Sequence, residues 1–226
     1  MRAVERGEPR GSLKWIRAAV NQRPDLLCQK VSDALGLTGK HIEWVSPRAD
    51  DEYAEYGDQD FLERLGIQLS HRPLEHFWPN RGPQWDALGR SPTGEVFLVE
   101  AKANVPEVVS PGTGASADSR RLIEQSLSEV KEFLRVDRDI VWSGRLYQYA
   151  NRLAHLYLLR QLNAVPAYLI FVYFIGDEGV SGPRSVAEWK AALTVAKRVL
   201  GISERNPLGR YTCDVFIDVQ AVEAGA

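Results

Sequence analysis

The stretch Gln84–Lys102, QWDALGRSPTGEVFLVEAK, contains two apolar runs separated by a turn-rich GRSPTGE segment. This pattern predicts a hairpin with strands over 84–88 and 96–102. The second strand ends in a glutamate and a lysine, and because side chains alternate across a strand, Glu100 and Lys102 leave the same face. Buried strands rarely carry charges without a reason, so we expect either a structural ion pair or an active site here.

Helical and strand patterns continue on both sides of this hairpin. Helices are predicted over about 12–20, 24–36, 50–65, 119–135, 144–162 and 185–200. Further strands are predicted over 41–45, 167–175 and 212–219, with a short one at 76–78. The run AYLIFVYFI at 167–175 is apolar throughout, which is typical of a central strand buried on both faces. This order predicts an α/β fold with a mixed central sheet, preceded by an N-terminal helical hairpin.

Composition and charge limit the classes of function. The chain has 226 residues and a net charge of -2, so no global basic field points to nucleic acid, and any phosphate-binding surface must be local. The two cysteines, Cys28 and Cys213, have no metal-like spacing and are predicted to be free thiols in a reducing compartment. No apolar run approaches the ~20 residues that span a bilayer, and the N-terminus lacks a signal sequence. We therefore expect a cytoplasmic protein with no membrane contact.

The charged groups of the hairpin form a chemically specific set. Asp86 lies on the first strand, and a tight hairpin would bring it to the end of the sheet where Glu100 and Lys102 lie. Mg²⁺ and Mn²⁺ prefer oxygen ligands and are typically held by one or two carboxylates with water and substrate phosphate. A neighbouring lysine can orient an attacking water and offset charge in a phosphoryl transition state. Two carboxylates and an amine are therefore the groups that metal-assisted phosphodiester hydrolysis requires.

Asp86, thirteen intervening residues, and then Glu100-Ala101-Lys102 at the end of an apolar strand resemble the PD-(D/E)xK nuclease superfamily. The resemblance covers roughly residues 50–175 and departs from the family's pattern at Trp85, where the family has proline. It implies a restriction-endonuclease-like three-layer α/β sandwich over 46–226, with 1–45 as a helical extension. It also implies that the acids Asp86 and Glu100 bind a divalent metal and that Lys102 assists the nucleophilic water.

The resemblance implies two further site residues. The family often has a glutamate on a helix before the hairpin, which places the third metal-binding acid at Glu55, with Glu52 and Glu63 as competitors. Many members carry a glutamine on a helix after the third strand, and Gln148 fits that position. Other polar residues lie along related faces of the same helix: Asn151, Arg152 and His155. For three tyrosines, packing in the core is favoured over stacking on bases: Tyr147, Tyr149 and Tyr157. For His155, a buried structural role is favoured over binding a metal.

The predicted function is Mg²⁺- or Mn²⁺-dependent hydrolysis of nucleic acid, with DNA favoured over RNA. The catalytic set would be Asp86, Glu100, Lys102, Glu55 and Gln148. The alternative is a catalytically inactive member of the same fold that binds nucleic acid or protein, since folds host many functions. A third alternative is an α/β domain in which the hairpin charges are only structural. The helices over 119–135 and 144–162 carry enough apolar side chains for a homodimer, although core packing explains them equally well.

Overall fold

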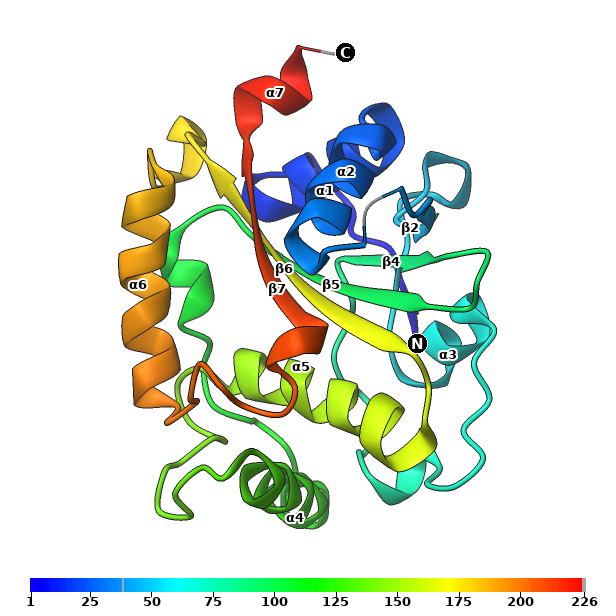
Figure 1. Cartoon of the computed structure of the whole chain (residues 1–226), viewed down its shortest axis with the longest axis vertical. Helices are drawn as coiled ribbons and strands as arrows, with labels where there is room; N and C mark the ends of the chain where they lie inside the picture. Colours follow the sequence, from blue (N-terminus) through cyan, green and yellow to red (C-terminus); the bar gives the residue numbers. More distant parts are fainter. Residues whose placement is uncertain (38, 225–226) are drawn as a thin grey trace.

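A five-stranded mixed sheet forms the centre of the computed structural model, which describes residues 1–37 and 39–224 (Figure 1). Its strands, in spatial order, are β2 (Glu43–Ser46), β4 (Ala87–Arg90), β5 (Val96–Lys102), β6 (Ala167–Ile175) and β7 (Thr212–Asp218). The pairs β2–β4 and β4–β5 are antiparallel, whereas β5–β6 and β6–β7 are parallel. A separate two-stranded sheet joins β1 (Arg2–Ala3) to β3 (Glu55–Tyr56).

Helices cover both faces of this sheet and give the chain three layers (Figure 1). One face carries α1 (Gly11–Gln22), α2 (Pro24–Leu35) and the short α7 (Val219–Glu223). The other carries α3 (Asp58–Leu65), α4 (Ala117–Leu134), α5 (Tyr147–Tyr157) with its π-helical extension Leu158–Leu162, and α6 (Val186–Val199). Short 3₁₀ turns lie at Ala49–Asp51, Leu74–His76, Val105–Val108, Glu178–Val180 and Gly209–Tyr211. The predicted α/β architecture with a mixed central sheet is thus confirmed.

The central strand β5 divides its side chains between the two cores. Phe97 and Val99 pack with α1 and α2, whereas Leu98 packs with α4 and α5. The predicted alternation is therefore confirmed, and by the same parity Glu100 and Lys102 face the α4–α5 side. The backbone of β5 is bonded on one edge to β4 and on the other to β6, which fixes these two residues in a rigid position.

Two local predictions were wrong. The helix predicted over 50–65 is a 3₁₀ turn, the strand β3 and then α3, so Glu55 lies on a strand and not on a helix. Gly57 separates the two parts: a Cβ there would lie 2.7 Å from the carbonyl oxygen of Pro83, so the close approach of the two segments needs glycine. The strand predicted at 76–78 is instead part of a 3₁₀ turn and loop.

The N-terminal helices share their core with the sheet. The helical hairpin predicted before the main domain is present as α1 and α2, and Trp15, Ile16 and Leu27 pack against the face that carries Phe97. Cys28 and Cys213 are both free thiols, as predicted. None of the helices in the described part of the chain combines the length and the hydropathy that a membrane crossing needs.

Candidate active site

The hairpin register places Asp86 beside Glu100. Ala87 pairs with Val99 in the antiparallel β4–β5 ladder, so the next pair outward is Asp86 and Glu100. One carboxylate oxygen of Asp86 accepts a hydrogen bond of 2.6 Å from the backbone N–H of Ala101, which fixes the side chain at the end of β5. The sheet therefore holds both carboxylates of the sequence motif at one edge.

The carboxylate of Glu100 is buried and doubly ion-paired. The ammonium of Lys102 donates to Oε1 of Glu100, and the guanidinium of Arg152 donates from Nε to Oε2 at 2.5 Å. Lys102 also donates a hydrogen bond of 3.0 Å to the side-chain oxygen of Gln148. Glu100 and Arg152 are only 2% and 3% exposed, so this ion pair is shielded from water. The attraction between opposite charges is stronger in the low dielectric of the interior than in water.

Helix α5 supplies the residues that meet the strand. Gln148 and Arg152 are four residues apart and thus share one face of the helix, one turn apart. The backbone N–H of Gln148, in the first turn, donates to the hydroxyl of Ser110 at 3.0 Å, which ties the start of α5 to the loop after β5. Arg152 also donates to the carbonyl oxygen of Gln84 at 2.7 Å. The helix is consequently anchored to β5 and to the segment that leads into β4.

Among the three glutamates considered for the upstream position, only Glu55 faces this site. It lines the same cleft as Asp86, and its carboxyl is influenced by the charge of Glu100. Glu52 is exposed and pairs with Arg2. Glu63 lies on α3 and lines a different pocket. The choice of Glu55 thus agrees with the geometry, although the element that carries it was predicted wrongly.

The site's charges shift one another's ionisation. Burial alone would raise the pKa of Glu100, but Arg152 and Lys102 outweigh it and hold that pKa below its ordinary value. Burial would lower the pKa of Lys102, yet the charges of Glu100 and Asp86 raise it. Burial and the charge of Glu100 raise the pKa of Asp86 well above its usual range, and burial raises the pKa of Glu55 to about 7. The two acids without a cationic hydrogen-bond partner are therefore the ones whose charged forms are disfavoured.

Asp86 and Glu55 border an open cleft of about 830 Å³, whereas Glu100 and Lys102 lie behind its wall. Glu55 lines it from β3, Gln84 and Asp86 line it from the segment just before β4, and Gln148 and Arg152 line it from α5. Two loops complete the walls, 79–83 and 110–116. The first loop is held by Asp58, which accepts hydrogen bonds from the backbone N–H groups of Arg81 and Gly82. The second loop belongs to the Pro/Gly/Ser-rich segment after Lys102, a kind of long loop that is often functional.

The chemistry of the cleft suits a divalent cation in part. Asp86 and Glu55 offer carboxylate oxygens, the ligands that Mg²⁺ and Mn²⁺ prefer, and the disfavoured ionisation of both would be relieved by a cation. Glu100 uses one oxygen for each of its two cationic partners, so it would have to exchange its bond to Lys102 to serve as a ligand. Within the described residues no three acidic, histidine or cysteine side chains are grouped as a ready-made metal cage. The donor set fits a metal held by few protein ligands.

Two residues of this site were not selected from the sequence. Arg152 lies outside the predicted catalytic set, but its spacing of four from Gln148 on the same helix is a signal that identifies it. Gln84 is two residues before Asp86 and hence on the same face of the extended segment. Neither polar atom of the Gln84 side chain has a hydrogen-bond partner in the described part of the chain, and both are shielded from water.

The aromatic and histidine residues of α5 belong mainly to the core, as predicted. His155 is buried, with ring-centroid distances of 5.0 Å to Trp78 and 6.0 Å to Trp85. Tyr149 is stacked on Phe171 with centroids 4.4 Å apart. The ring of His155 lies among aromatic rings, and its Nδ1–H donates to the carbonyl oxygen of Asn151 at 2.8 Å, so it is not placed as a metal ligand.

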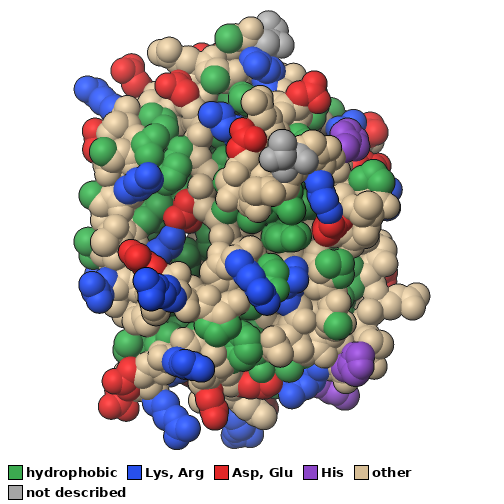
Figure 2. All heavy atoms as spheres, viewed as in Figure 1, with side chains coloured by type: hydrophobic (Ala, Val, Ile, Leu, Met, Phe, Trp, Pro, Cys, Tyr) green, Lys and Arg blue, Asp and Glu red, His purple; other side chains and the backbone are tan. Residues whose placement is uncertain are grey.

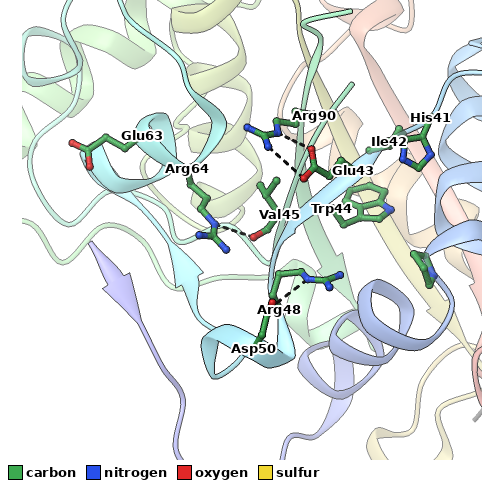
Figure 3. Close-up of a pocket in the computed structure, with 11 residues that line it drawn as sticks. His41, Ile42, Glu43, Trp44, Val45, Arg48, Asp50, Glu63, Arg64 and Arg90 are labelled. Atoms are coloured by element: carbon green, nitrogen blue, oxygen red, sulfur yellow. Dashed lines mark hydrogen bonds and ion pairs between the residues drawn. The ribbon is translucent and has the colours of Figure 1, made fainter. Parts of the chain in front are cut away.

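A second pocket lies at the β2 edge of the sheet, and its three arginines are each bound to a group of the protein (Figure 3). Arg90 pairs with Glu43, Arg48 with Asp50, and Arg64 donates to the carbonyl of Val45 at 2.9 Å. Each guanidinium is thus engaged within the protein. This pocket lacks the convergence of acids and amine that distinguishes the cleft at Asp86.

Comparison with known proteins adds no assignment. No protein-family model matches the chain, and neither a curated protein nor a solved structure does. The class of protein must therefore be inferred from the geometry of the cleft.

Proposed function

We propose that this chain is a Mg²⁺- or Mn²⁺-dependent nuclease of the restriction-endonuclease-like fold, with DNA as the favoured substrate. The observation that carries the proposal is the meeting of Asp86, Glu100, Lys102 and Gln148 at the end of β5, beside an open cleft that Glu55, Asp86 and Gln148 line. These residues come from four separate segments, so their convergence is a property of the fold and not of local sequence. The three-layer architecture around a mixed sheet is compatible with the resemblance to PD-(D/E)xK nucleases.

The metal would be held by Asp86 and Glu55, with Glu100 as a further ligand if it releases Lys102. When bound, a divalent cation supplies positive charge that polarises the phosphodiester and its attacking water. The protein's part is to hold the acids in place, which the backbone N–H of Ala101 does for Asp86. Arg152 does the same for Glu100 through a buried ion pair.

Lys102 would act as a cation and not as a base. Its raised pKa keeps the ammonium protonated near neutral pH, and Glu100 and Gln148 fix its position from two sides. From its place against Gln148, which lines the cleft, the ammonium would donate to the attacking water or to a non-bridging phosphate oxygen, where negative charge grows in the transition state. Gln148 would thus be a positioning residue that acts through Lys102.

The test is metal-dependent cleavage by the Lys102→Met variant. With Mn²⁺ or Mg²⁺ and a labelled DNA substrate, we expect the wild type to cleave and the variant to lose about 10²–10³-fold in rate, the size of effect seen when one transition-state donor is removed. Lys30→Met, at an exposed position of α2, is the matched control and should cleave normally. If Lys102→Met cleaves at the wild-type rate, Lys102 has no part in the mechanism. A wild type that cleaves neither DNA nor RNA would refute the nuclease proposal.

The alternative function is binding without catalysis on the same fold. It is favoured by one observation: both oxygens of Glu100 are already occupied by cationic side chains, which leaves this acid closed to a metal until a bond is broken. A metal titration separates the two functions, because a ligand that binds the folded state raises the melting temperature. If Mn²⁺ raises the melting temperature of the wild type but not of Asp86→Ala, the metal site is supported. If it raises neither, the binding function is preferred.

A further inference from the structure

A basic hollow lies between α6 and the segment that leads into β7. It measures about 830 Å³ and is visible in Figure 2 as a recess beside α6 with Lys and Arg side chains around it. Four cationic side chains line it, against two acids, Glu204 and Asp214. The cations are Lys190, Lys197, Arg198 and Arg205. A local excess of positive charge therefore exists on a chain whose net charge is -2.

Most of this positive charge is uncommitted. Lys197 is paired with Asp214 at 2.5 Å. The other three cations, Lys190, Arg198 and Arg205, form no ion pair with any acid among residues 1–37 and 39–224. A lone surface cation is usually just solvated, but three around one hollow repel one another and raise the local concentration of anions. The hollow is consequently suited to a ligand that carries several negative charges.

The hollow and the candidate active site lie on the same face of the sheet. Glu100 pairs with Phe171 in β6, and Phe171 pairs with Asp214 in β7, so the three form one row across the sheet. Neighbouring strands are about 4.8 Å apart, which puts the backbones of Glu100 and Asp214 about 10 Å from each other. Tyr149 of α5 is stacked on Phe171 and lines the hollow, whereas Gln148 beside it lines the catalytic cleft. The start of α5 thus separates two adjoining sites.

We propose that this hollow binds the phosphate backbone of a nucleic-acid strand on one side of the phosphodiester held in the catalytic cleft. Lys190, Arg198 and Arg205 would each contact backbone phosphates, which Lys and Arg do without regard to base sequence. A separation of about 10 Å lies within the span of a short oligonucleotide, since one strand of a duplex advances ~3.4 Å along the helix axis per nucleotide. The link to cleavage rests on the proposed nuclease function, whereas the binding itself does not.

The test is the binding of a labelled oligonucleotide to the triple variant Lys190→Ala/Arg198→Ala/Arg205→Ala. Binding is measured by fluorescence anisotropy with EDTA present, so that no cleavage occurs, at several salt concentrations. Each lost phosphate contact lowers the slope of log K against log[salt] by about 0.7–0.9, so we expect the slope to fall by about 2–3 and Kd to rise at least about 10-fold. The matched control removes the same charge elsewhere: Arg6→Ala/Arg10→Ala/Lys30→Ala, in the N-terminal segment and on α2. It should bind like the wild type.

The outcomes separate the two proposals. A wild type that cleaves while the triple variant binds as tightly as the control would overturn the hollow's role and leave the nuclease proposal standing. A wild type that never cleaves, with binding lost only in the triple variant, would support the hollow and refute the nuclease. Competition distinguishes a strand from a small anion: full displacement of the oligonucleotide by equal concentrations of a nucleoside monophosphate or inorganic phosphate would overturn the strand as the ligand.

Discussion

Replacing Arg152 by methionine is the sharpest test of how the candidate site is held together. The guanidinium of Arg152 neutralises Glu100 at 2.5 Å, donates to the carbonyl of Gln84 and lies 4.8 Å from the ring centroid of Trp85. Arg152→Met keeps much of the side-chain volume but leaves a buried carboxylate oxygen without its partner. Removing one member of a buried ion pair typically costs about 3–5 kcal/mol, a large part of the 5–15 kcal/mol that stabilises most domains.

Urea unfolding followed by tryptophan fluorescence measures this cost. We expect Arg152→Met to lower the free energy of unfolding by about 3–5 kcal/mol. The double variant Glu100→Gln/Arg152→Met should recover part of that loss, because the uncompensated charge is gone and residues in one network are not additive. Arg121→Met is the matched control: Arg121 pairs with Asp118, but both side chains are exposed, at 81% and 94%, so stability should not change.

Two results would refute this reasoning. If Arg152→Met is as stable as Arg121→Met, the ion pair is not a buried one in solution. If the loss of stability in the double variant equals the sum of the losses in Glu100→Gln and Arg152→Met, the two residues are not energetically coupled.

Two further predictions concern buried polar groups beside the site. Burial lowers the pKa of His155 to about 4, below its unfolded value of about 6.5. Stability is therefore full above pH 6.5 and falls by about 3 kcal/mol as the pH drops to 4, since only the unfolded chain takes up the proton. In urea unfolding between pH 7.5 and 4, His155→Phe should lack this part of the loss, and an equal pH dependence in both proteins would contradict it. Gln84→Met should raise the free energy of unfolding by about 1–3 kcal/mol, because it removes a buried amide without partners. The control is Gln125→Met, at an exposed position, which should leave stability unchanged. A melting temperature lowered by Gln84→Met would show that the amide is hydrogen-bonded in solution.

Much of the fold follows from local sequence patterns. The alternation of VFLVEAK fixes which side chains of β5 enter each core, because the two-residue period of a strand leaves no other arrangement. The uninterrupted apolar run of β6 identified it as a strand covered on both faces, which it is. Gln148 and Arg152 share one face of α5 for a similar reason, because residues four apart in a helix lie one turn apart.

Other features could not be read locally. Glu55 lies on β3 because that segment pairs with Arg2–Ala3, more than fifty residues earlier in the chain. A helical pattern of acids and aromatics does not reveal such a distant partner, and Gly57 was the only local sign of a break. The strand predicted at 76–78 is likewise absent, and a 3₁₀ turn at Leu74–His76 begins this segment. In the described part of the chain, no strand of either sheet pairs with it.

The sequence by itself determined the side-chain parity of the hairpin, and hence that Glu100 and Lys102 share a face. Only the tertiary structure decided that Asp86 lies beside them, that Arg152 and Gln148 reach them from α5, and that Glu55 faces the same cleft. The physical reason is the range of the interactions. Strand alternation is set by bonds between successive residues, whereas the convergence of charges depends on how a sheet register and a packed helix bring distant segments together.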